Sequence, residues 1–161
     1  MKKHVLLLLA IFIAIPLAAQ QKLDEAEIIQ ASFGVKKKAI MESFVNVPET
    51  EKDAFWKLYD EYETKRAVYG KERIKLLTEY AEKWQDLKPE DADRLVLESV
   101  ALNNKFDKLL AQYYKKIRKA TSIETAVKFY QVETYIRATV HFYVKNTIPF
   151  VYGDNLKKLS Y

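Results

Sequence analysis

Hydrophobic residues recur at helical spacing from Glu49 to about Asp86. They are three, four or seven residues apart, at Phe55, Leu58, Tyr62, Tyr69, Leu76, Tyr80, Trp84 and Leu87. This spacing predicts one long amphipathic helix, because it keeps the apolar side chains on one face. Such a helix would run roughly 55 Å, which exceeds the diameter of a compact domain of this size. The pattern therefore predicts an elongated or dimeric molecule.

Two more long helices follow along the chain. The first begins at Pro89, a residue that the first turn of a helix tolerates. Its apolar stripe alternates by four and three residues and consists of Leu95, Ser99, Leu102, Phe106, Leu109, Tyr113 and Ile117. The second extends from Ser122 to Thr147, ends before Pro149, and is apolar around most of its circumference. A helix of that kind is buried or pairs with another chain. We therefore expect an all-α fold, an elongated bundle of long antiparallel helices.

Two helix starts carry capping signals. Thr121 and Glu124 have the spacing of a capping box, in which the hydroxyl accepts a hydrogen bond from the third amide and the carboxylate reaches back. This pair predicts a helix that starts at Ser122. Asn46, three residues before Glu49, is a possible cap for the long helix.

The N-terminal third of the chain contains shorter segments. Residues 1–19 combine two lysines, an apolar run and small residues, which is typical of a secretory signal peptide. We therefore expect export to the periplasm, with no stable membrane span in the mature form. The pattern also predicts a short helix from Leu23 to Phe33 and another from Lys36 to Val45. We expect residues 20–151 to form a single domain and residues 152–161 a C-terminal tail.

Composition excludes several classes of function. The chain has no cysteine, so it has no disulfide and no thiolate metal site, and its stability must come from packing. The formal charge is +5, with the cations spread along the helices, and no basic face or module predicts nucleic-acid binding. After the signal peptide only one histidine remains, His141, which we expect to be packed or at an interface. No phosphate loop or nucleophile elbow occurs, so we expect neither an enzyme nor a cofactor. Metal binding by surface carboxylates stays open.

Glu133 lies among apolar residues of the last helix. A buried glutamate is rare unless it is paired, so we expect an ion pair with Arg66 or Arg73 of the long helix. A role of these charges in binding is the alternative. Gly70, midway along that helix, is either a tolerated defect or the place of a bend or close helix approach.

The two helix starts and their surroundings resemble a known family. Residues 47–51 (VPETE) and 121–125 (TSIET) are similar to the two L-T-x-x-Q motifs of the Spy/CpxP family of periplasmic helical stress proteins, although several motif positions differ. The aromatic pairs that follow each motif strengthen the resemblance. The residues that carry it are Val47, Glu51, Phe55, Trp56, Thr121, Ser122, Glu124, Phe129 and Glu133.

The resemblance implies a thin, curved, cradle-shaped homodimer. It also implies either ATP-independent chaperone activity toward unfolded or aggregating envelope proteins, or restraint of an envelope-stress sensor. A purely structural helical module is a third interpretation. Cations and an aromatic residue gather around Gly70, where a bend would make the helix concave. We therefore predict a client-binding surface there, formed by Lys65, Arg66, Tyr69 and Arg73.

Overall fold

A computed structural model describes residues 36–147 of the chain. Residues 36–45 are helical, and they are followed by the 3-10 helix η1 (Glu49–Glu51) and by the helices α2 (Lys52–Lys83), α3 (Pro89–Ala120) and α4 (Ile123–Thr147). Helices contain 91% of the described residues, and none of these residues lies in a strand. The prediction of an all-α bundle with long helices is confirmed.

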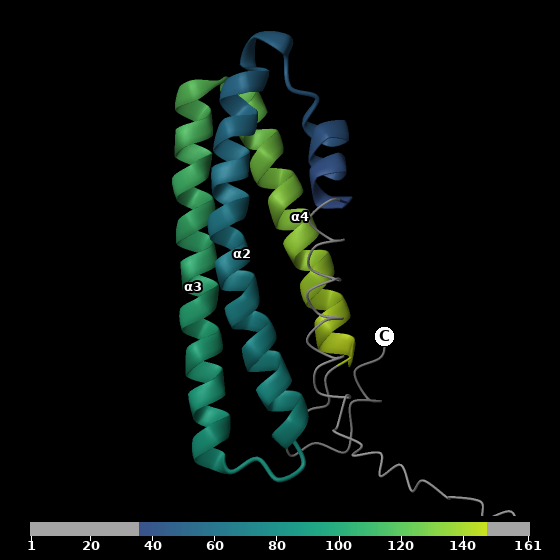
Figure 1. Ribbon diagram of the computed structural model, residues 1–161, viewed down its shortest axis with the longest axis vertical. Helices are drawn as coiled ribbons and strands as arrows, with labels where there is room; N and C mark the ends of the chain where they lie inside the picture. The colour runs from purple at the N-terminus through teal and green to yellow at the C-terminus, as the bar shows by residue number, and fades with distance from the viewer. Residues whose placement is uncertain (1–35, 148–161) are drawn as a thin grey trace, which may run out of the picture.

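The long helices are arranged side by side (Figure 1). α2 and α3 form an antiparallel hairpin, and α4 runs antiparallel to α3 and leans away from the hairpin toward its own C-terminal end. Residues 36–45 lie at the end of the bundle where α2 begins and α3 ends. The described part of the molecule is therefore elongated, with a bundle of helices at one end and the α2–α3 hairpin extending to the other. The predicted signal peptide, the predicted helix from Leu23 to Phe33 and the predicted tail of residues 152–161 lie outside the described residues.

The apolar stripe of α3 forms the inner face of the hairpin. Six of its seven predicted positions are buried, and Ser99 is the exposed exception. On α2 the buried residues are Phe55, Tyr59 and Tyr62, whereas Leu58 is only partly buried. The prediction thus located the buried face of α2, but it placed Leu58 in the core, whereas Tyr59 is the residue that is buried there. α2 continues as a helix through Gly70 with a negative φ, so this glycine does not end it.

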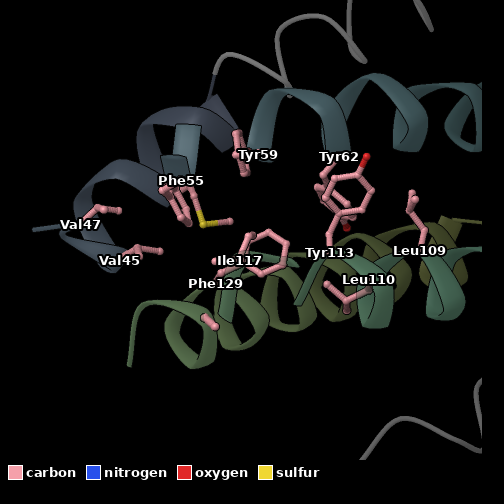
Figure 2. Packing of buried hydrophobic residues seen from close by; sticks show 12 residues of the cluster. Val45, Val47, Phe55, Tyr59, Tyr62, Leu109, Leu110, Tyr113, Ile117 and Phe129 are labelled. Carbon is pink, nitrogen blue, oxygen red and sulfur yellow. The ribbon is translucent and has the colours of Figure 1, made fainter. Parts of the chain in front are cut away.

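The core is concentrated at one end of the bundle. Figure 2 shows side chains from α2, α3, α4 and residues 36–47 pointing toward one another. Aromatic rings dominate this cluster: the ring of Phe129 lies edge-on to the rings of Phe55, Tyr59 and Tyr62, with centroids 5.4 to 6.5 Å apart. Each such pair contributes about 0.5–1.5 kcal/mol beyond the area that it buries. This aromatic cluster holds the N-terminal ends of α2 and α4 together.

Asn46 does not cap the long helix, contrary to prediction. Its φ is 46°, in the left-handed region that asparagine tolerates, and its amide donates a 3.4 Å hydrogen bond to the carbonyl of Glu42. Asn46 therefore ends the helix of residues 36–45, as glycine or asparagine often does. η1 begins after Pro48, without a side-chain cap.

Candidate functional site

The two segments that resemble the family motifs meet in space. Glu51 Oε2 accepts hydrogen bonds from Thr125 Oγ1 at 2.6 Å and from Ser122 Oγ at 3.2 Å. Val47, Phe55 and Phe129 all belong to the aromatic core beside these bonds. Segments more than 70 residues apart in sequence therefore join the start of α2 to the start of α4.

Thr121 and Glu124 do not form the predicted capping box. Thr121 Oγ1 donates a 2.7 Å hydrogen bond back to the carbonyl of Ile117, and so satisfies the C-terminal end of α3. Ser122 caps α4 instead, because its Oγ accepts a 3.2 Å hydrogen bond from the amide of Thr125. Glu124 points into solvent and pairs with Lys128. Only Thr121 and Ser122 separate α3 from α4, and Thr121 hydrogen-bonds to the last turn of α3 rather than to the first turn of α4.

Glu133 is buried as predicted, but its partner is a lysine rather than an arginine. Lys37 Nζ donates a 2.8 Å hydrogen bond to the Glu133 carboxylate, and the Tyr62 hydroxyl donates another of 2.8 Å. Lys37 is only 2% exposed and also pairs with Glu63, which in turn accepts hydrogen bonds from Arg66. The sequence prediction missed Lys37 because nothing in the spacing of a short basic run shows that one lysine turns inward.

Burial dominates the electrostatics of this network. It raises the pKa of Glu133, while the neighbouring Lys37 lowers it and the Glu63 carboxylate raises it further. It also raises the pKa of the Tyr62 hydroxyl, which the charge of Glu133 raises further. The Tyr62 hydroxyl and the Oε2 atom of Glu133 are occupied by hydrogen bonds within the network, whereas Glu133 Oε1 is buried without a hydrogen-bond partner. The arrangement links residues 36–45, α2 and α4, and we call it the buried clamp.

Of the four residues predicted as a client site, Lys65, Tyr69 and Arg73 lie along the seam between α2 and α3. Tyr69 is partly buried, with its ring edge-on to Phe106 at 5.5 Å. Lys65 Nζ lies 5.5 Å from the centre of the Tyr113 ring, and the Arg73 guanidinium lies 4.8 Å from that of Phe106. Arg66 pairs with Glu63. These cations contact aromatic rings and a carboxylate of their own chain, so they leave little free aromatic surface at this place.

A larger apolar surface lies on α4, on the side away from the core. We call it the outer face of α4; its large exposed side chains are Ile123, Val127, Tyr130, Tyr135 and Phe142. The core-facing residues Ala126, Phe129 and Ile136 lie on the opposite side of the helix. Tyr135 is 72% exposed and Phe142 is 64% exposed. The sequence predicted that α4 is apolar on most sides, but only the structure shows which side the bundle leaves open.

Charged groups lie both on this face, where Glu124 and Lys145 are exposed, and along its border. Arg137, at its edge, pairs with Asp107 of α3, and Lys128 pairs with Glu124. Gln131, Thr134 and Ala138, which lie between the exposed aromatic residues, carry no charge. The outer face can therefore take up apolar and aromatic groups, while cations at its border attract acidic ones.

α3 carries a second, smaller group of exposed apolar residues. Val96, Leu97 and Val100 are each more than half exposed, and they lie away from the buried stripe of the same helix. The sequence analysis did not single them out, because it followed the stripe that faces the core.

The described residues contain no group of three or more potential metal ligands among His, Cys, Asp and Glu. Within residues 36–147, no helix is both long and apolar enough to cross a membrane.

Comparison with known protein families, with characterised proteins and with solved structures found no match. The resemblance to the Spy/CpxP family therefore stays a prediction that rests on the motif segments and the aromatic residues that follow them.

Proposed function

We propose that this protein is an exported, ATP-independent chaperone-like protein that binds unfolded or aggregating polypeptides. The exposed outer face of α4 is the observation that supports this proposal, because large apolar side chains that gather on one exposed face often mark an interaction site. Tyrosine and phenylalanine supply large contact area with few rotatable bonds, so they bind varied partners at small entropic cost. The net charge of +5, which becomes +3 when Lys2 and Lys3 leave with the predicted signal peptide, favours encounter with acidic or unfolded chains.

The predicted cluster of Lys65, Arg66, Tyr69 and Arg73 has a supporting part in this proposal. Lys65 and Arg73 extend along the α2–α3 seam, and Lys65 is solvent-exposed. We propose that they attract clients at long range and that the outer face of α4 supplies the apolar contact.

The test is suppression of aggregation, measured by light scattering with several unrelated substrates and without ATP. We expect the wild-type protein to suppress all of them. The double variant Tyr135→Ser and Phe142→Ser should lose most of this activity, because two exposed aromatic side chains are removed without disturbing the core. Phe44→Ser is the matched control, since Phe44 is an equally exposed phenylalanine outside α4.

The outcomes separate the competing interpretations. Broad suppression that the double variant loses supports the proposed function. No suppression of any substrate would contradict it and favour an adaptor for a single envelope sensor or a purely structural module. Suppression that survives in the folded double variant would contradict the assignment to α4. The double variant Lys65→Ser and Tyr69→Ser then tests the α2–α3 seam.

A further inference from the structure

Arg73 is a partly buried cation without a carboxylate partner among residues 36–147. Its Nη2 donates a 2.6 Å hydrogen bond to Asn103 Oδ1 of α3, and its Nη1 contacts His141 Nε2 of α4. Its Nε is buried and has no hydrogen-bond partner. A buried charge and a buried donor are both unfavourable when they are left unpaired. Nη1 and Nη2 each carry a second N–H group, so the guanidinium has unused capacity to bind an anion.

The surroundings of Arg73 are positively charged. Arg137 and Lys145 of α4 lie close enough to influence His141, and among the described residues Asp107 of α3 is the one carboxylate that does so. Asp107 already pairs with Arg137 at 2.5 Å. The junction of α2, α3 and α4 thus gathers three cations and a histidine around a single carboxylate that is already paired. A bound anion would relieve this excess of positive charge.

The geometry also holds the guanidinium in place. Arg73 stacks on Phe106, with its central carbon 4.8 Å from the ring centre, and the hydrogen bond to Asn103 fixes its rotation. A fixed guanidinium fork matches the oxygens of a carboxylate or phosphate group. Arg73, Arg137 and His141 are all partly exposed, so one edge of the cluster opens to solvent. We propose that Arg73, Arg137 and His141 form a binding site for an oxyanion, a carboxylate or a phosphate group.

His141 couples this site to pH. Arginine can only donate, so His141 Nε2 must accept from Arg73 and the imidazole is neutral in the empty site. Burial, followed by the charges of Arg73, Arg137 and Lys145, lowers the pKa of His141, while Asp107 raises it. A bound anion stabilises the protonated imidazole, and by reciprocity protonation of His141 tightens anion binding. Affinity should therefore increase as the pH falls. This inference goes beyond the proposed function and does not depend on it.

Histidine NMR of the full chain tests the proposal. The protein has two histidines, so His4 reports non-specific ionic effects while His141 reports the site. Sodium phosphate and sodium acetate are titrated separately against chloride at constant ionic strength. We expect a saturable shift of the His141 imidazole and a rise in its pKa, with His4 unchanged. Saturation by acetate at the lower concentration indicates a carboxylate ligand, and saturation by phosphate at the lower concentration indicates a phosphate ligand.

Variants separate specific binding from charge. Arg73→Lys keeps the positive charge but loses the planar pair of guanidinium donors. It should weaken anion binding by about tenfold or more, which corresponds to the loss of one hydrogen bond to a charged group. Arg66→Lys is the matched control and should bind as the wild type does, because Arg66 already pairs with Glu63. If Arg73→Lys fails to fold by circular dichroism, Arg137→Lys replaces it and should also bind more weakly. An unchanged His141 resonance, a shift equal to that in chloride, or undiminished binding by the folded variant would overturn the proposal.

Discussion

Lys37 and Lys38 are neighbours in sequence but differ completely in environment. Lys37 is enclosed by Glu63, Glu133 and Tyr62, whereas Lys38 forms an exposed pair with Asp60 at 2.9 Å. The Lys37 ammonium also lies 5.3 Å from the centre of the Tyr62 ring. Exposed ion pairs contribute little, because water and salt screen them and both side chains lose freedom. Removal of one partner from a buried pair leaves the other charge uncompensated.

This contrast gives a prediction for stability. Lys37→Met should lower the free energy of unfolding by about 3–5 kcal/mol, and Glu133→Ala should have a similarly large effect. Lys38→Met, the matched control, should change it by less than about 1 kcal/mol. Urea denaturation followed by circular dichroism measures all three. Equal effects of Lys37→Met and Lys38→Met would show that the buried clamp is not important for stability.

At the scale of the element, the start of α4 depends on Ser122, whose hydroxyl forms hydrogen bonds both to α4 and to η1. Ser122 accepts from the amide of Thr125 and donates to Glu51, which lies at the end of η1. It therefore both caps α4 and connects α4 to the start of α2. Glu124, two residues further along, pairs with the partly exposed Lys128.

The competing caps can be told apart by single substitutions. Ser122→Ala should destabilise the protein by about 1 kcal/mol or more, since it removes a helix cap and also leaves Glu51 with one donor fewer. Glu124→Ala should change stability by no more than about 0.5 kcal/mol. Thermal unfolding of both variants provides the comparison. A larger effect of Glu124→Ala than of Ser122→Ala would support the capping box that the sequence predicted.

At the scale of the whole molecule, exposed apolar residues lie on two different helices. Those of α4 form its outer face, and those of α3 are Val96, Leu97 and Val100. One surface can serve clients while the other joins two copies of the chain, and a symmetric pair of copies is the commonest arrangement among oligomers. We propose that α3 provides the contact of the homodimer.

Sedimentation at micromolar concentration tests this assembly. We expect a mass twice that of a single chain for the wild type and for the double variant Tyr135→Ser and Phe142→Ser. Leu97→Lys should shift the mass toward that of the monomer, because it places a charge within the apolar contact. A monomeric wild type contradicts the dimer. A monomeric Tyr135→Ser and Phe142→Ser variant would instead assign the contact between copies to the outer face of α4.

The sequence by itself determined the helices and most of their buried faces. The four-and-three spacing of α3 required one face to be apolar, and six of its seven positions are buried. The burial of Glu133 also followed from the sequence, since its neighbours along the helix are apolar. These properties are local, because side chains three or four residues apart on a helix share a face whatever packs against it.

The tertiary structure decided which residues meet across helices. Lys37 pairs with Glu133, 96 residues further along the chain, and no spacing within either helix encodes that contact. The roles of Thr121 and Asn46 also depend on tertiary structure. Each could cap the helix after it or end the helix before it, and the turn geometry makes each of them hydrogen-bond to the helix before it. The open side of α4 likewise depends on where the neighbouring helices lie. Periodicity shows that a helix has apolar faces, but packing determines which of them stays exposed.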